Sequence, residues 1–204
     1  MCNRKTINGA LLLMICLFTA SVGASTLMWK KSYGLEKQGK YAQAAEAIEP
    51  MAKAGKDEYA VLRYAYLLYK QGRYNDSFDY YRKAMEMNRD SIDARLGITL
   101  PLLAQKRWRQ VTVYTRQVLV KAEWNHTAHV RLMTAEEGMR KWHTLGRHAQ
   151  EVTRVYPSDP MLWVYLARAR AWMGDVKSAK AAYEKVLIRE PDNEEAAEYL
   201  AKNE

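Results

Sequence analysis

The chain has 204 residues and a formal net charge of +9 at pH 7, from 32 Lys and Arg residues against 23 Asp and Glu residues. Its two cysteines, Cys2 and Cys16, both lie in the first 24 residues. This usage excludes a small domain held together by disulfides, and the rest of the chain is long enough to bury an apolar core without them.

The first 24 residues have the pattern of a secretory signal peptide. Two basic residues, Arg4 and Lys5, precede an apolar run that closes with small residues up to Ala24. This order favours a cleaved leader, so we expect residues 1–24 to be removed and the protein to reach the periplasm or outer envelope. The alternative is an uncleaved anchor over residues 9–29, which is just long enough to span the inner membrane.

A three-residue pattern recurs along the rest of the chain with a period of about 34 residues. The copies are Gly39-Lys40-Tyr41, Gly72-Arg73-Tyr74, Lys106-Arg107-Trp108, Arg140-Lys141-Trp142 and Gly174-Asp175-Val176. Their first residues are 33, 34, 34 and 34 apart. A fixed period of this size is typical of a helical repeat protein, which offers a surface for binding rather than a catalytic pocket.

The clearest copy runs from Pro160 to Asn193 and reads as two helices. Pro160 suits the first turn of a helix, and Gly174 ends that helix before the second one begins. The motif consists of Trp163, Leu166, Ala167, Ala179, Tyr183 and Pro191. This copy resembles the tetratricopeptide repeat. Arg170 and Val186 depart from the pattern of that family, which usually has an aromatic residue and an Ala at these positions.

The resemblance implies an all-α fold, a right-handed α-solenoid of about five helix-turn-helix repeats. By the period, we expect the repeats near residues 25–57, 58–91, 92–125, 126–159 and 160–193, followed by a capping helix over residues 194–204. Asp192 and Glu195 have the spacing of a capping box, which predicts Asp192 as the N-cap of the last helix. In that helix we expect Ala197, Tyr199 and Leu200 to pack inward.

In tetratricopeptide repeat proteins the first helix of each repeat lines a concave groove, and the resemblance implies the same here. The groove positions are then Trp29, Tyr33, Tyr59, Tyr66, Tyr69, Lys70, Arg168 and Trp172. Such a wall suits a peptide with apolar anchors and acidic neighbours. In the second repeat, either the pair Tyr66 and Tyr69 or the pair Tyr64 and Leu68 faces the groove, and we assign the first pair to it.

The third and fourth repeats carry nearly all of the excess positive charge. Residues 92–157 contain 11 Lys and Arg residues and 5 Asp and Glu residues, a net charge of +6. The spacing predicts a basic stripe of Arg107, Arg109, Arg116, Arg131, Arg140, Lys141 and Arg147. A stripe of this kind attracts anionic partners, more weakly as salt rises. Nucleic acid is not expected as the partner, because the leader takes the chain away from it.

The sequence has no pattern that indicates catalysis, a metal site or a cofactor. The sequence has no third metal ligand at a fixed spacing from the histidine pairs His126 and His129 or His143 and His148. It also has no phosphate-binding glycine loop and no nucleophile motif. We therefore expect a non-catalytic scaffold that holds a protein or peptide partner for an assembly, secretion or biogenesis system. The alternative is a protein that binds an anionic envelope polymer, such as an exported acidic polysaccharide, through the basic repeats.

Overall fold

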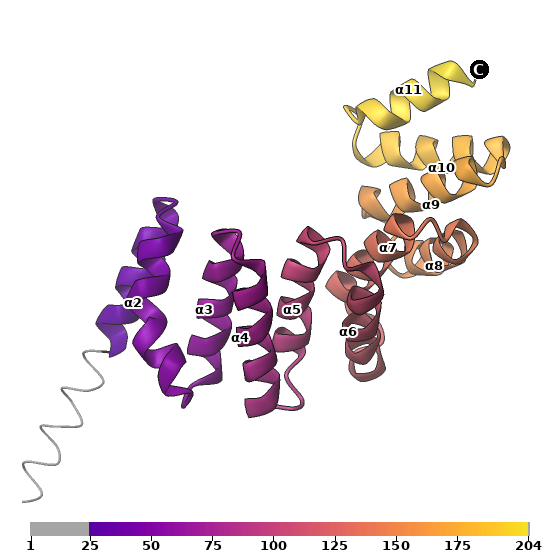
Figure 1. The fold of residues 1–204 in the computed structure, drawn as a ribbon. Coiled ribbons are helices and arrows are strands. Elements are labelled where there is room, and N and C mark those ends of the chain that lie inside the picture. Colours follow the sequence, from indigo (N-terminus) through magenta and orange to yellow (C-terminus); the bar gives the residue numbers. More distant parts are fainter. Residues whose placement is uncertain (1–24, 204) are drawn as a thin grey trace, which may run out of the picture. The chain divides into compact units, whose positions relative to one another are not determined.

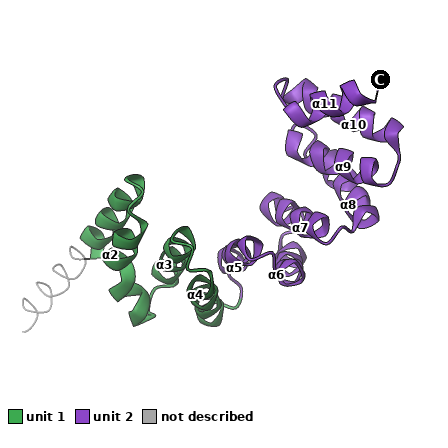
Figure 2. Cartoon of the chain, turned by 45° about the horizontal axis from the view of Figure 1, so that its top comes forward, with its two compact units in different colours: residues 1–89 green, residues 90–204 purple. Residues whose placement is uncertain are grey.

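The computed structural model describes residues 25–203, which form an all-α fold with no β-strand in that range (Figure 1). These residues divide into two compact units, one that ends at Arg89 and one that starts at Asp90 (Figure 2). Within each unit, helices that follow one another along the chain pack together as hairpins. The predicted all-α repeat fold is confirmed.

The first unit contains the helix of residues 25–37 and three further helices. These are α2 (Tyr41–Ala54), α3 (Glu58–Lys70) and α4 (Tyr74–Met87). The middle helix, α3, packs against both α2 and α4. Its apolar residues Val61, Leu67 and Leu68 are fully buried, as is Ile48 of α2. These side chains belong to the apolar core of the unit, whose burial stabilises the packed helices.

The second unit contains seven helices in the described part of the chain. They are α5 (Ile92–Ala104), α6 (Trp108–Lys121), α7 (His126–Gly138), α8 (Trp142–Val155), α9 (Pro160–Trp172), α10 (Val176–Arg189) and α11 (Glu194–Lys202). Alternate helices also touch, because α7 contacts both α5 and α9. The first helices of successive repeats therefore line up as one face. One apolar core joins α7 to α11, with Met133, Leu145 and Leu162 fully buried.

Five helices, the first helices of the second to fifth repeats and the last helix of the chain, begin at a polar residue whose side chain caps them. The N-caps of α3, α5, α7, α9 and α11 are Asp57, Ser91, Asn125, Asp159 and Asn193, each 34 residues after the one before. In each case a side-chain oxygen accepts a hydrogen bond from a backbone N–H of the first turn, which would otherwise lack a partner. The caps thus keep the period more strictly than the turn triplets do.

The second helix of each repeat follows a residue with a left-handed backbone. In three turns this residue is a glycine, with φ values between 72° and 76° at Gly39, Gly72 and Gly174. At the equivalent positions of the third and fourth repeats, Lys106 and Arg140 both have a φ of 55°. A residue with a Cβ atom is strained in this region, whereas glycine is not. Two repeats therefore form the same turn at a higher conformational cost.

The last helix starts differently from the prediction. Asn193, rather than Asp192, is the N-cap of α11, and its side chain accepts a hydrogen bond from the N–H of Ala196 at 3.0 Å. Ala196 is buried and Ala197 is exposed, so the expectation for Ala197 was wrong. Ala196 has i, i+3 and i+4 spacing with Tyr199 and Leu200, which places these three residues on one face and leaves Ala197 off it. Two other residues expected to pack inward, Tyr199 and Leu200, are half-buried against the core.

None of the helices within residues 25–203 combines the length and the apolar character needed to cross a membrane. The predicted leader, residues 1–24, lies outside the described residues. The alternative anchor over residues 9–29 lies mostly outside them as well.

Candidate binding surfaces

The first unit presents an aromatic cluster that joins the helix of residues 25–37 to α3. The indole of Trp29 stacks on the ring of Tyr59, with 4.9 Å between centroids and 23° between planes, and on Tyr33 at 6.1 Å. The hydroxyl oxygens of Tyr33 and Tyr59 are 2.5 Å apart. Because Tyr59 is 57% exposed, these three rings offer a flat aromatic surface to solvent.

The buried guanidinium of Arg63 packs against this cluster. The guanidinium carbon of Arg63, one helical turn after Tyr59, lies 4.0 Å from the ring centroid of Tyr33. Its Nη1 donates to Glu36 at 2.5 Å, and its Nε donates to the hydroxyl of Ser32 at 3.3 Å. Its Nη2 is buried without a hydrogen-bond partner among the described residues. Burial, and then the hydrogen bond with Tyr59, raise the pKa of the Tyr33 hydroxyl above its usual value.

A second aromatic cluster lies at the other end of α3. The ring of Tyr69 lies 6.5 Å from that of Tyr66 and 6.0 Å from that of Tyr74, measured between centroids. The ammonium of Lys70 lies 4.9 Å from the ring centroid of Tyr41. Hydrogen bonding to Tyr41 raises the pKa of Lys70, and burial raises the pKa of the Tyr66 hydroxyl. The cluster therefore combines half-buried rings with an exposed cation.

The opposite side of α3 is buried in the unit. Tyr64 is 5% exposed and Leu68 is fully buried. The Tyr64 hydroxyl donates a hydrogen bond to Glu49 at 2.9 Å, and burial together with this bond raises the pKa of Tyr64 to about 12. Thus α3 presents Tyr66 and Tyr69 at the surface and directs Tyr64 and Leu68 into the core.

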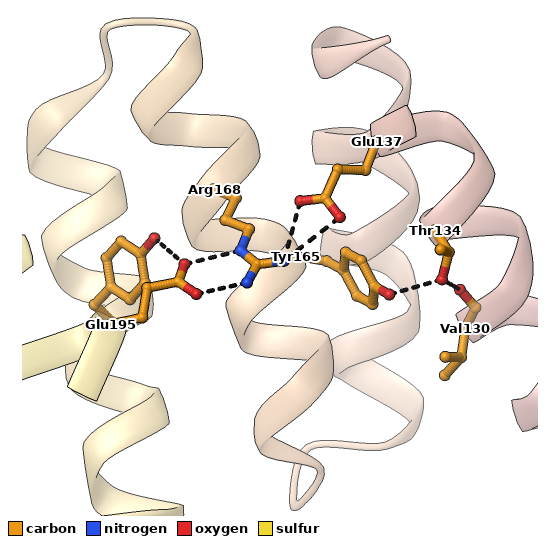
Figure 3. A network of polar contacts seen from close by, with 7 residues as sticks. Val130, Thr134, Glu137, Tyr165, Arg168 and Glu195 are labelled. Carbon is orange, nitrogen blue, oxygen red and sulfur yellow. Dashed lines mark hydrogen bonds and ion pairs between the residues drawn. The ribbon is translucent and has the colours of Figure 1, made fainter. Parts of the chain in front are cut away.

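In the second unit, Arg168 of α9 is the centre of an ion-pair network (Figure 3). Its Nε and Nη2 donate to the two carboxylate oxygens of Glu195 on α11, at 2.8 and 2.5 Å. Its Nη1 donates to Glu137 on α7 at 3.1 Å, and the hydroxyl of Tyr183 donates to Glu195 at 2.7 Å. The hydrogen bonds between them raise the pKa of Arg168 and lower that of Glu195. Arg168 therefore ties three helices together and shares its charge with two carboxylates.

The other predicted groove residue of this unit, Trp172, lies at the end of α9. Its indole stacks on that of Trp142 at the start of α8, with 5.0 Å between centroids and only 2° between planes. Trp172 is 65% exposed, so the stack is open to solvent. Both rings border an open hollow of about 640 Å³. The hollow is lined by Arg140, Lys141, Trp142, His143, Thr144, Trp172 and Met173.

A second hollow, of about 370 Å³, lies at the equivalent turn one repeat earlier. It is lined by Lys106, Arg107, Trp108, Arg109, Gln110 and Met139. The ring of Trp108 packs so closely on Gly138 that a Cβ atom there would lie 2.5 Å from it. The two hollows adjoin, because Met139 lines one and its neighbour Arg140 lines the other. We call this joined surface of the second unit the turn edge.

The residues of the predicted basic stripe do not all lie at the turn edge. Arg107, Arg109, Arg140 and Lys141 line its hollows. Arg116 and Arg147 are exposed in the middle of α6 and α8, outside both hollows. The guanidinium of Arg131 donates to the hydroxyl of Thr99 at 2.8 Å and to the carbonyl of Leu96, so it joins α7 to α5.

Two of the four histidines form a polar relay between α7 and α8. The Nδ1 of His129 lies 2.8 Å from the Nε2 of His148, and the Nδ1 of His148 lies 2.9 Å from a carboxylate oxygen of Glu136. The remaining nitrogen of His129 is 2.9 Å from the carbonyl of Glu123. Burial, and then the charge of His148, lower the pKa of His129. Within residues 25–203 no three His, Cys, Asp or Glu residues are placed to hold a metal ion.

Four residues at these surfaces were not predicted as site residues: Arg63, Trp142, Glu137 and Glu195. Arg63 lies four residues after Tyr59 on one helix, a spacing that places both on the same face. Glu137 and Glu195 lie 31 residues before and 27 residues after Arg168, close to one repeat away. The positions one full repeat from Arg168 are Thr134 and Lys202, so the repeat period alone does not pair Arg168 with these acidic residues.

The tetratricopeptide repeat family matches two segments, residues 31–92 and 160–203, which together make up 106 of the 204 residues. The chain belongs to the tetratricopeptide repeat family. Proteins of this family generally bind protein partners, and their repeat fold generally acts as a non-catalytic scaffold. The two aromatic clusters of the first unit lie on or beside α3, the first helix of a tetratricopeptide repeat.

Several solved structures share this tetratricopeptide repeat fold. MamA (41-end) from Desulfovibrio magneticus RS-1 is 17% identical, with a TM-score of 0.75 over 84% of this chain and 97% of that one. A tetratricopeptide repeat protein from Parabacteroides merdae ATCC 43184 is 11% identical, with a TM-score of 0.77 over 89% and 72% of the two chains. Identities this low show the fold alone.

A relative by sequence is Superkiller protein 3 from Schizosaccharomyces pombe, 27% identical over 123 residues. The match covers 55% of this chain but only 9% of that protein. The chain therefore spans less than a tenth of the length of this relative.

Proposed function

We propose that this tetratricopeptide repeat protein is exported to the periplasm or outer envelope. There it holds a protein or peptide partner for an assembly, secretion or biogenesis system. The family supports the binding of a protein partner, and the basic and apolar pattern of residues 1–24 supports export. The proposed binding surface is the face that the helix of residues 25–37 and α3 form in the first unit.

One observation carries this proposal, the exposed aromatic cluster of Trp29, Tyr33 and Tyr59 in the first unit. Aromatic rings bind partners well because they bury a large area at a small entropic cost. Below the rings, the Nη2 of Arg63 has no hydrogen-bond partner among the described residues. This cation is already paired with Glu36, whereas the exposed ammonium of Lys70 at the other end of α3 favours a negatively charged neighbour. The partner is therefore a segment with aromatic or aliphatic anchors next to Asp or Glu.

The partner can be tested by crosslinking in the native host, followed by mass spectrometry. The test variant carries Tyr59→Glu and Tyr69→Glu, which place negative charge on both aromatic clusters of the first unit. The control variant is Met87→Glu, at an exposed position on the second helix of a repeat. We expect one protein to disappear from the crosslinked set of the test variant alone. If the sets match while circular dichroism shows intact helices, this surface does not hold the partner.

Export can be tested separately by cell fractionation and by sequencing the N-terminus of the mature protein. A cleaved leader predicts a soluble periplasmic protein that starts at Ser25. A full-length protein that stays with the inner membrane would instead support the anchor over residues 9–29. Recovery of the full-length chain from the cytoplasm would contradict both forms of the proposal.

A second candidate function is the binding of an anionic polymer through the basic central repeats. The observation that favours it is the gathering of four predicted stripe residues along two adjoining hollows of the second unit. Neither hollow is lined by an acidic residue. Attraction of this kind falls as ionic strength rises, whereas binding to the aromatic clusters of the first unit responds less to salt.

A further inference from the structure

We infer that the turn edge of the second unit is a binding site for a glycan built from uronic acids. The site would hold sugar rings against Trp172 and their carboxylates against the basic residues of the two turns. This inference rests on the second candidate function, binding of an anionic polymer, and names the residues and the ligand class. It is separate from the aromatic clusters of the first unit.

The positive charge of the turn edge favours an anionic ligand. The two hollows are lined by five Lys and Arg residues in all, Lys106, Arg107, Arg109, Arg140 and Lys141, and by no Asp or Glu. The cations of the turn edge thus act together on a negatively charged ligand.

The solvent-exposed stack of Trp142 and Trp172 favours a ligand with a flat apolar face. Trp142 covers one face of Trp172, and 65% of Trp172 remains exposed. The face of an indole is the negative side of its quadrupole, so it attracts the slightly positive C–H groups on one side of a pyranose ring. A stacked ring with cations beside it therefore fits a sugar that carries a carboxylate.

The arrangement of the hollows fits a chain rather than a single sugar. They lie at equivalent turns of consecutive repeats, each with two or more basic residues and a tryptophan. They adjoin at Met139 and Arg140, so one extended ligand can occupy both. In a polymer of identical acidic rings, one ring can bind in each hollow. Because the two rings belong to one chain, binding of the first raises the effective concentration of the second and so raises the affinity.

The backbone of the two turns is a further sign that the basic residues serve a ligand. Lys106 and Arg140 hold a left-handed φ of 55° at positions where three other turns have glycine. Residues kept in strained conformations gather at functional sites, because a role for the side chain offsets the cost. Each of these two residues places a basic side chain in the lining of a hollow.

The same surface is poorly suited to reading the base sequence of a nucleic acid. Base edges are recognised by amide and carboxylate side chains as well as by arginine. The hollows contain one such side chain, Gln110, and its oxygen already accepts a hydrogen bond from Arg107. The proposed export also separates the protein from nucleic acid. A uronic-acid chain needs only cations and an aromatic face, and both are present.

The test measures binding of the purified protein to polygalacturonate by tryptophan fluorescence at low salt. Fully methyl-esterified polygalacturonate has the same rings without charge, and poly-aspartate has the charge without the rings. A single-stranded oligonucleotide is the fourth ligand. We expect polygalacturonate to bind at least about tenfold more tightly than each of the other three.

Two variants with equal charge loss locate the site. The first carries Lys106→Gln and Arg140→Gln at the turn edge, and the second carries Arg116→Gln and Arg147→Gln outside the hollows. A third variant, Trp172→Ala, removes the open aromatic face without changing charge. We expect the first and third variants to weaken polygalacturonate binding by about tenfold and the second to weaken it far less. Circular dichroism checks that each variant is folded.

The outcomes separate this inference from the function on which it rests. Equal binding of polygalacturonate and poly-aspartate, with equal losses in both charge variants, would keep an anionic polymer as the ligand but overturn the glycan site. Tighter binding of the oligonucleotide with dependence on Trp172 would overturn it in favour of nucleic acid. If no anionic polymer binds, both the second candidate function and this inference fail.

Discussion

At the residue scale, Lys106 and Arg140 adopt a backbone conformation for which the chain uses glycine in three other turns. The left-handed region costs an L-residue about 1–2 kcal/mol. Replacing that residue with glycine removes this cost, but glycine also has more conformational freedom in the unfolded chain, which cancels part of the gain in stability. Arg140→Gly should therefore raise the free energy of unfolding by about 0.5–1 kcal/mol. Urea denaturation measures this change.

The reverse substitution is the control for this prediction. Gly72→Arg, at the equivalent turn of the first unit, should lower the free energy of unfolding by a similar amount. A destabilised Arg140→Gly protein would mean that contacts of the Arg140 side chain outweigh the backbone strain. Together with the glycan site, the prediction implies that Arg140→Gly gains stability and loses polymer binding.

Also at the residue scale, the relay of His129 and His148 predicts a pH dependence of stability. The pKa of His129 is lowered in the folded protein by burial and by His148, whereas it is about 6.5 in the unfolded chain. As the pH falls below about 6.5, His129 takes up a proton in the unfolded chain before it does so in the folded protein. The free energy of unfolding should thus be constant above about pH 7 and fall below about pH 6.5, by at most about 1.4 kcal/mol per pH unit for one proton.

Urea denaturation at a series of pH values from 8 to 5 measures this effect. The groups that act on His129 are His148, the carbonyl of Glu123, and the charges of Glu151 and His126. His129→Gln should flatten the profile between pH 7 and 5, whereas His143→Gln, at an exposed residue, should leave it as in the wild type. A wild-type profile that is flat in this range would show that the relay takes up a proton without loss of stability.

At the element scale, α11 is held to the second unit by one buried alanine, half-buried Tyr199 and Leu200, and the Arg168 network. Glu195→Ala removes the carboxylate that accepts from Arg168 and Tyr183. Because this ion pair is more than a third exposed, we expect a modest loss of about 1 kcal/mol in the free energy of unfolding. Hydrogen exchange should become faster in α11 first.

The neighbouring exposed residue gives a matched control for this element. Glu194→Ala, in the same first turn of α11, removes an equal charge without touching the network. It should change neither the free energy of unfolding nor the exchange of α11 appreciably. Equal effects of the two substitutions would show that the charge at the helix start matters, and that the bond to Arg168 does not.

At the scale of the whole molecule, stability should be close to a sum of local terms. In a repeat protein each helix contacts mainly its neighbours, so a defect spreads only a short way along the chain. Leu162→Ala in α9 removes a fully buried side chain and should cost about 2–5 kcal/mol in local stability. Exchange should rise most in α8, α9 and α10, and least in α5 of the same unit.

Hydrogen exchange with peptide resolution measures this gradient. A conservative substitution at an exposed apolar residue of the same unit, Val120→Ala, is the control and should leave exchange unaffected. A uniform rise across all helices of the second unit after Leu162→Ala would contradict the local picture. It would show that this unit unfolds as one cooperative body.

The sequence by itself determined the repeat architecture, because turn residues and helix caps act over a few neighbouring residues. The triplets at 33–34-residue spacing predicted where each second helix begins, since a left-handed residue must precede it. Asn193 shows the limit of such local reading. Asp192 was predicted as the cap from spacing alone, and the backbone placed the next residue there.

Only the tertiary structure decided what the surface residues contact. Arg168 and Trp172 lie four residues apart, yet one is held by Glu137 and Glu195, and the other stacks on Trp142. These partners come from other repeats, about 27 to 31 residues away, and no local rule pairs them. The fold of each repeat follows from local preferences, whereas the chemistry of its surface depends on which side chains the neighbouring repeats bring beside it.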